Sequence, residues 1–183
     1  MKIKLIGISG RARSGKDSLA HILGRHGYHR IAFADALKVV TAQIADEDSH
    51  LYFNEVTKEQ HCDALDMTRR VALQRVGHAI RESLGEDTWV NRALREWVDL
   101  GRPATVVSDC RYENEAIAIK ALGGIVVRVV RPGAGLTGEA ANHASEVQLP
   151  DDLVDVEINN DGTLGELADE ARKIALMLQE PLE

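Results

Sequence analysis

Aromatic residues are scarce in this sequence and make up 4% of its 183 residues. Proteins that bind single-stranded nucleic acid stack its bases on aromatic side chains, so this scarcity argues against such a surface. The formal net charge of −7 argues in the same direction, because general binding to a polyanion needs an excess of basic residues. We therefore expect no nucleic-acid polymer among the partners.

Cysteine is also scarce, and Cys62 and Cys110 form neither a close pair nor a metal-type spacing. Two reduced thiols are typical of a cytoplasmic protein. No apolar run approaches the roughly 18 residues that a membrane-spanning helix needs. The N-terminal apolar run is too short for a signal peptide. The sequence predicts a cytoplasmic protein with no membrane partner.

Apolar runs with the length of strands alternate with helix-like segments along the whole chain. We expect a first strand before Gly10 and further strands at about 28–33, 104–109, 125–130 and 156–158. We expect helices at about 15–26, from 34, and at 68–84, 88–100, 113–122 and 163–178. Residues 46–60 are polar and indicate a loop or a short helix. Near-continuous apolar strands between helices predict an α/β fold with a mostly parallel sheet of about five strands, flanked by helices. The length fits a single domain over 1–183.

The stretch after the first apolar run has the pattern of a phosphate-binding loop. Gly10 and Gly15 are separated by four residues, Lys16 follows directly, and a helix-favouring segment comes next. Glycines let backbone N–H groups curl around an anion, the helix N-terminus adds its dipole, and the lysine reaches the outer phosphates. The alternative is a plain strand–turn–helix connection. The predicted triphosphate-binding residues are Gly10, Arg11, Ala12, Arg13, Ser14, Gly15, Lys16, Asp17 and Ser18.

One position departs from the general pattern of this loop. The residue after the lysine is normally Ser or Thr, whose hydroxyl ligates Mg²⁺. Here that residue is Asp17, and a hydroxyl follows one place later at Ser18. Either side chain is able to hold the metal, directly or through water.

An apolar strand that ends in Ser108 and Asp109 supplies the second group of candidates. An acid after a strand beside a phosphate-binding loop is typical of the metal-associated carboxylate of kinases, so Asp109 is a candidate for Mg²⁺ or for the acceptor. Arg111 is placed to clamp a phosphate. The alternatives are a helix cap or turn for Asp109 and a surface ion pair for Arg111.

A third group of polar residues lies in the mainly helical region 34–101. Asp35 and Lys38 follow the second strand, whereas Arg70, Gln74 and Arg81 share one sector of a helix. Such a cluster is able to bind the phosphate and base of a second nucleotide. The alternative is a solvated charged face.

The loop 131–150 is long for a compact domain, which is typical of a lid. Arg128 and Arg131 flank its part from Pro132 to Pro150, which contains His143, Ser145 and Glu146. A lid suits a kinase, which excludes water so that ATP is not hydrolysed. The alternative for His143 is an ordinary surface residue.

Several motifs in one order connect these observations: GRARSGKDS, FADALK, RVALQRVG, GEDTWVNR, VVSDCRYENEAIAIKALGGIVVRVVRPG and HASEVQLPDDLVDVEINNDGTLGEL. With them the chain resembles the deoxynucleoside monophosphate kinases of bacteriophages and prophages, within the P-loop kinases. The resemblance covers nearly everything except 41–67. GKD followed by Ser or Thr is itself a feature of that family, so Asp17 supports the resemblance.

The resemblance implies a three-layer P-loop fold and transfer of the γ-phosphoryl group of ATP to a deoxynucleoside 5′-monophosphate, with Mg²⁺. It implies that Lys16 neutralises charge on the moving group. Asp109 would orient the metal or the acceptor, and Arg111 and Arg131 would stabilise charge in transit. The implied acceptor-site residues are Asp35, Lys38, Arg70, Gln74, Arg81 and Trp89.

Two other functions stay open at this point. Animal phosphomevalonate kinases carry a similar GKD loop, and their acceptor is also a phosphate monoester. A nucleotide-binding module that transfers no phosphate is the second alternative. A homodimer is likewise left open.

Overall fold

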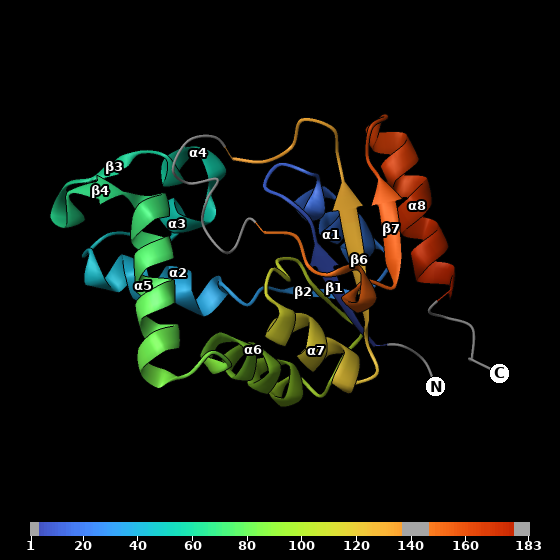
Figure 1. The fold of residues 1–183 in the computed structure, drawn as a ribbon, viewed down its shortest axis with the longest axis horizontal. Helices are drawn as coiled ribbons and strands as arrows, with labels where there is room; N and C mark the ends of the chain where they lie inside the picture. The colour runs from blue at the N-terminus through green and yellow to red at the C-terminus, as the bar shows by residue number, and fades with distance from the viewer. Residues whose placement is uncertain (1–3, 137–146, 178–183) are drawn as a thin grey trace. The chain divides into compact units, whose positions relative to one another are not determined.

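The structure is a computed structural model that describes residues 4–136 and 147–177 (Figure 1). The chain divides into two compact units, which are described separately below. Unit 1 comprises Met1–Ala32 and Arg95–Glu183, and unit 2 comprises Phe33–Leu94. The region 34–101, expected from the sequence to bind the acceptor, includes all of unit 2 except Phe33.

Unit 1 contains a five-stranded parallel sheet in the order β2-β5-β1-β6-β7. The sequence prediction of a mostly parallel sheet of about five strands is therefore confirmed. In register, Gly7 of β1 pairs with Val107 on one side and with Val126 on the other. The strands are β1 Leu5–Ser9, β2 His29–Ile31, β5 Thr105–Val107, β6 Ile125–Val130 and β7 Val156–Asn159.

Helices cover both faces of this sheet. Successive side chains of β1 point to opposite faces, so β1 contacts helices on both sides. Ile6 and Ile8 belong to the core that β1 shares with α1 and α8. On the other face, a Cβ at Gly7 would lie 2.4 Å from Cδ1 of Ile119 in α7, so glycine allows the close approach of that helix. The described helices of this unit are α1 Lys16–Arg25, α7 Glu113–Ala121, the 3₁₀ turn η4 Asp151–Leu153 and α8 Leu164–Met177, with α6 Thr88–Asp99 crossing the unit boundary.

Unit 2 is mainly helical. Its elements are α2 Asp35–Ile44, α3 His50–Phe53, α4 Glu55–Lys58, β3 His61–Cys62, the 3₁₀ turn η1 Asp63–Leu65, β4 Met67–Thr68 and α5 Arg69–Leu84. The short helices α3 and α4 occupy the segment expected to be loop or short helix. The β3–β4 hairpin was not predicted, because two-residue strands are too short to show an alternating pattern.

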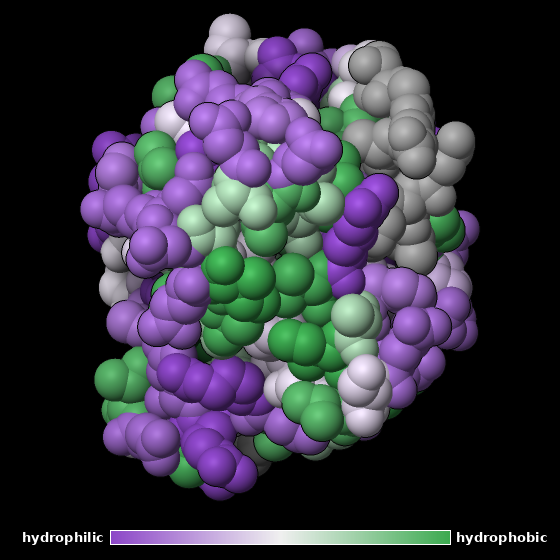
Figure 2. All heavy atoms as spheres, turned by 90° about the vertical axis from the view of Figure 1, so that its left-hand side faces the viewer, coloured by the Kyte–Doolittle hydropathy of each residue, from purple (hydrophilic) through white to green (hydrophobic). Residues whose placement is uncertain are grey.

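The surface of the protein includes apolar side chains. Figure 2 shows one face on which apolar side chains gather near the centre, with hydrophilic ones on several sides of them. Within unit 2, Ile44, Val56 and Leu84 are exposed. No helix in the described part of the chain is both long and apolar enough to cross a membrane.

A buried ion pair holds the start of α5 in unit 2. Arg69 donates through Nε (2.9 Å) and Nη2 (2.5 Å) to the two carboxylate oxygens of Glu47. Tyr52 also donates its hydroxyl to Glu47 (2.8 Å), and Arg69 reaches the carbonyl of Thr57 (3.2 Å). The hydrogen bonds from Arg69 hold the pKa of Glu47 below its ordinary value. Glu47 thus joins α5 to the residues that precede it.

We predict that Glu47→Ala destabilises the protein by about 2 kcal/mol, because Arg69 is then left buried without its partner. The difference between wild type and Glu47→Gln should be largest at neutral pH. Because the pKa of Glu47 is lowered in the folded protein, its contribution is present above the ordinary glutamate pKa and is lost as the pH falls through the lowered value. Denaturant unfolding at several pH values measures both effects.

The matched control is Glu170→Ala, which removes an exposed ion pair with Lys173 on α8. It should leave stability almost unchanged. An equal loss in both variants would contradict a special role for Glu47.

Candidate active site

The five strands of the sheet in unit 1 end at one edge, because β2, β5, β1, β6 and β7 all run parallel. Ligands in such sheets bind at this edge. Gly10 follows β1, Asp109 comes two residues after β5, Arg131 follows β6 and Asn160 follows β7. The topology therefore gathers the predicted phosphate-binding loop and two predicted catalytic side chains at this edge.

The loop after β1 needs glycine at both predicted positions. Gly10 has φ 134°, and a Cβ there would lie 2.3 Å from the carbonyl oxygen of Val129. Gly15 has φ 105°, and its Cβ would lie 2.2 Å from Nδ2 of Asn160. A side chain at either position would be strained and would also meet its neighbour. The two glycines thus allow the narrow turn that the sequence pattern predicts.

Lys16 begins α1 and lies across this loop. Its side chain is buried, and Nζ donates to the carbonyl oxygen of Arg11 (2.6 Å). Ala12 is buried, whereas the side chains of Arg11 and Arg13 are exposed. Ser14 is 1% exposed, and its hydroxyl has no hydrogen-bond partner among the described residues. An orphaned buried hydroxyl two residues before a buried lysine fits a loop that binds a phosphate group.

Asn160 is a residue of the site that the sequence reasoning missed. Its Nδ2 donates to the carbonyl oxygen of Ser14 (2.8 Å), and its backbone N–H donates to Val130 (2.7 Å). Asn160 therefore connects the loop to the ends of β6 and β7. Ser14 and Asn160 are 146 residues apart, so no local pattern marks the pair.

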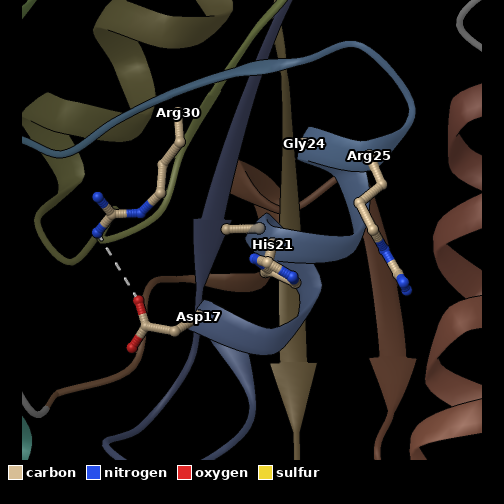
Figure 3. A pocket seen from close by; sticks show the side chains of 6 residues that line it. Asp17, His21, Gly24, Arg25 and Arg30 are labelled. Atoms are coloured by element: carbon tan, nitrogen blue, oxygen red, sulfur yellow. Dashed lines mark ion pairs between the residues drawn. The ribbon is translucent and has the colours of Figure 1, made fainter.

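Asp17 and Ser18 lie in the first turn of α1 and are exposed. The Asp17 carboxylate lies 3.9 Å from the guanidinium of Arg30, beside the shallow pocket along α1 that Figure 3 shows. In the described chain no group of three or more His, Cys, Asp or Glu side chains is arranged to hold a metal ion. Mg²⁺ commonly takes only one or two carboxylates from the protein and its other ligands from phosphates and water. The two side chains fit that sparse donor set, and their role as metal ligands stays a prediction.

Asp109 follows β5 in a segment that is fixed to its neighbours. The N–H of Cys110 donates to the carbonyl oxygen of Ile8 (2.9 Å). The buried carboxylate of Glu115 accepts from the backbone N–H of Arg111 (2.6 Å) and of Tyr112 (3.0 Å). Since Tyr112 is the N-cap of α7, Asp109 is not its cap. Glu115 thus positions the segment that carries Asp109 and Arg111.

Burial raises the pKa of the Cys110 thiol, and the charges of Glu115 and Asp109 add to this effect. A thiol that stays protonated is a poor nucleophile. Cys110 is therefore a packing residue between β1 and α7.

Arg131 is exposed directly after β6, at the start of the predicted lid. His143, Ser145 and Glu146 lie outside the described residues. Arg128 of β6 holds the other end of the loop. It donates to the carbonyl oxygen of Leu149 (2.5 Å) and pairs with Asp151 (2.6 Å). Arg128 therefore anchors the end of the segment that returns to the sheet.

Unit 2 holds all the predicted acceptor-site residues, and three of them, Asp35, Lys38 and Arg70, lie in the first turns of α2 and α5. Lys38 pairs with Asp35 (2.8 Å), and its ammonium lies 4.5 Å from the centroid of the Phe53 ring. Arg70 pairs with two glutamates, Glu55 (3.1 Å) and Glu59 (2.7 Å). Gln74 is half-buried one turn further along α5.

Arg81 lies in the last turn of α5, and Trp89 lies in the first turn of α6. Arg81 donates to the carbonyl oxygen of Glu86 (2.9 Å). The buried indole N–H of Trp89 donates to the carbonyl oxygen of Gly77 (3.4 Å). These bonds join the end of α5 to the start of α6. A role of either residue in acceptor binding stays a prediction.

Comparison with known proteins shows which family the chain resembles. A family model described as deoxynucleotide monophosphate kinase matches residues 66–171. A protein of Acanthamoeba polyphaga mimivirus, named provisionally as a deoxynucleotide monophosphate kinase, is 31% identical over 160 residues, which is 79% of this chain and 81% of that protein. The deoxynucleotide monophosphate kinase of Enterobacteria phage T4 is 32% identical over 127 residues, or 63% of this chain. This chain covers 48% of the phage protein's length.

A solved structure confirms the fold predicted from the sequence. The dephospho-CoA kinase from Campylobacter jejuni superposes with a TM-score of 0.58, covering 96% of each chain, at 15% sequence identity. At that identity the similarity shows the fold alone, which is that of the P-loop kinases.

We predict that Asn160→Ala weakens the binding of ATP about tenfold, since losing one buried hydrogen bond costs about 1.4 kcal/mol. Calorimetric titration with ATP and Mg²⁺ measures the change. The matched control is Asn159→Ala, because Asn159 is an exposed asparagine at the end of the same strand. If both variants bound ATP like the wild type, the loop would hold its shape without the bond from Asn160.

Proposed function

The chain belongs to the deoxynucleotide monophosphate kinase family, and from that premise we propose that it transfers the γ-phosphoryl group of ATP to a deoxynucleoside 5′-monophosphate. Family membership makes the protein a kinase that acts in nucleotide phosphoryl transfer. ATP, Mg²⁺ and the deoxynucleotide acceptor are the parts that we add. The observation that supports ATP as the phosphoryl donor is the loop in which Lys16 and the orphaned hydroxyl of Ser14 are both buried.

In the proposed mechanism the loop from Gly10 to Ser18 binds the ATP phosphates. Its backbone N–H groups and the ammonium of Lys16 stabilise negative charge on the transferred group. Asp17 or Ser18, with Asp109, would hold Mg²⁺, which neutralises charge on the phosphates when bound. Phosphoryl transfer is mainly positioning and electrostatic stabilisation, so few further groups are required.

Unit 2 supplies the proposed acceptor site. The cationic ends of Lys38 and Arg70 suit the phosphate of the acceptor, with Asp35 and Gln74 beside them. Arg81 and Trp89 are kept as further acceptor-site candidates. The attacking atom is a phosphate oxygen that is already anionic, so the reaction needs no strong general base. As it attacks the γ-phosphorus, the bond to the β-phosphate oxygen breaks and ADP leaves. Arg111 and Arg131 are proposed to stabilise the charge during this transfer.

An acceptor panel tests the proposed function. We predict that dAMP, dCMP, dGMP or dTMP, or several of them, stimulate ADP release from ATP with Mg²⁺, whereas phosphomevalonate does not. Lys16→Ala should lower this turnover about a hundredfold or more, because it removes charge stabilisation from the transition state. Lys4→Ala is the control, since Lys4 is an exposed lysine at the start of the same strand region.

Two outcomes of the acceptor panel would contradict the proposed function. Stimulation by phosphomevalonate alone would replace the proposed acceptor. ATP binding without any acceptor-dependent turnover would indicate a nucleotide-binding module.

A further inference from the structure

Three cationic side chains of unit 2 are nearly buried within one small region. The side chains of Lys38 and Lys58 are each 11% exposed, and that of Arg70 is 14% exposed. They come from three different helices, α2, α4 and α5 (Figure 1). Lysine and arginine are rarely buried to this degree in proteins unless they are paired.

The positive charges lie close enough to affect one another. Burial lowers the pKa of the Lys58 ammonium, Glu55 opposes this, and the charges of Lys38 and Arg70 lower it further. Like charges that are brought together out of water repel one another, which destabilises the protein unless an anion binds between them. A perturbed ionisable group with specific charged neighbours marks a candidate functional site.

The glutamates that pair with Lys58 and Arg70 are exposed to solvent. The Glu55 side chain is 63% exposed and that of Glu59 is 46% exposed. Glu55 bridges two of the cations, with Oε1 2.5 Å from Nζ of Lys58 and Oε2 3.1 Å from Nη2 of Arg70. Two oxygens of one anion on two cations is also how a phosphate monoester binds.

We propose that Lys58 and Arg70 together bind the phosphate of the acceptor nucleotide. In the absence of the acceptor, the Glu55 carboxylate occupies the position of that phosphate. This inference rests on the proposed function. A dianionic phosphate carries more charge than a carboxylate and offers three oxygens, so it displaces Glu55 from the two cations. The exposed Glu55 side chain, on a four-residue helix, then turns to solvent at small cost.

A purely structural network makes a different prediction. If these ion pairs only joined α4 to α5, removing either partner would loosen the region, and both substitutions would change acceptor binding in the same direction. In the proposal, Lys58 assists the acceptor and Glu55 competes with it. The two substitutions should therefore have opposite effects on the KM for the acceptor.

The experiment compares Lys58→Gln, Lys58→Arg and Glu55→Gln with the wild type, using the four common deoxynucleoside monophosphates. Lys58→Gln should raise the acceptor KM about tenfold or more, since a hydrogen bond between charged groups is lost. Lys58→Arg should restore much of this loss, and Glu55→Gln should lower the KM. The KM for ATP should stay unchanged in all three. Calorimetric titration with the same nucleotides gives a readout that is independent of turnover.

Lys173→Gln is the matched control, because Lys173 pairs with Glu170 at the same spacing of three residues on α8. It should leave both KM values unchanged. An unchanged acceptor KM in Lys58→Gln, or a raised or unchanged one in Glu55→Gln, would overturn the inference. Should Lys58→Gln fail to fold, Glu55→Gln alone decides by the same criterion. A wild type that turned over none of the deoxynucleotides would overturn the proposed function itself, and this inference with it.

Discussion

The central position of β1 in the sheet is the constraint on which the donor site depends. β1 pairs in parallel with β5 and β6 on its two sides, so the chain leaves it through a narrow space beside the end of β6. Only glycine fits at position 10, where the carbonyl oxygen of Val129 is too close for a Cβ. The turn places Lys16 at the start of α1, and Asn160 closes the loop from the end of β7. The geometry of the predicted phosphate-binding loop is thus a property of the whole sheet.

In unit 2 the comparable constraint is electrostatic. Glu47 and Arg69 hold the start of α5, directly before Arg70. The neighbouring cations Lys38 and Lys58 come from other helices, and each is matched by a carboxylate nearby. The unit therefore keeps positive groups poorly hydrated but paired with carboxylates. A phosphate anion is suited to replace such a carboxylate.

The sequence predicted those parts of the molecule whose signals are local. The apolar run before Gly10 and the glycine spacing up to Lys16 marked a strand, a loop and a helix in order, and the parallel sheet followed from the alternation of strands and helices. Lys58 and Asn160 were missed for different reasons. Lys58 lies in a polar stretch without periodicity, and its proposed role rests on a tertiary arrangement in which the charges of Lys38 and Arg70 lower its pKa further. Asn160 contacts a residue 146 positions away. The predicted roles of Asp17 and Arg81 depend on bound ligands, which no pattern of residues describes.

The central claim is that unit 1 binds the phosphoryl donor and unit 2 binds the acceptor. The most direct measurement is the calorimetric binding of ATP and of a deoxynucleoside monophosphate, each alone, to Lys16→Ala and to Arg70→Gln. The exposed neighbour variant Arg75→Gln serves as the control. The account predicts that Lys16→Ala loses affinity for ATP and keeps the monophosphate, whereas Arg70→Gln does the reverse. Loss of the same ligand in both variants would contradict it.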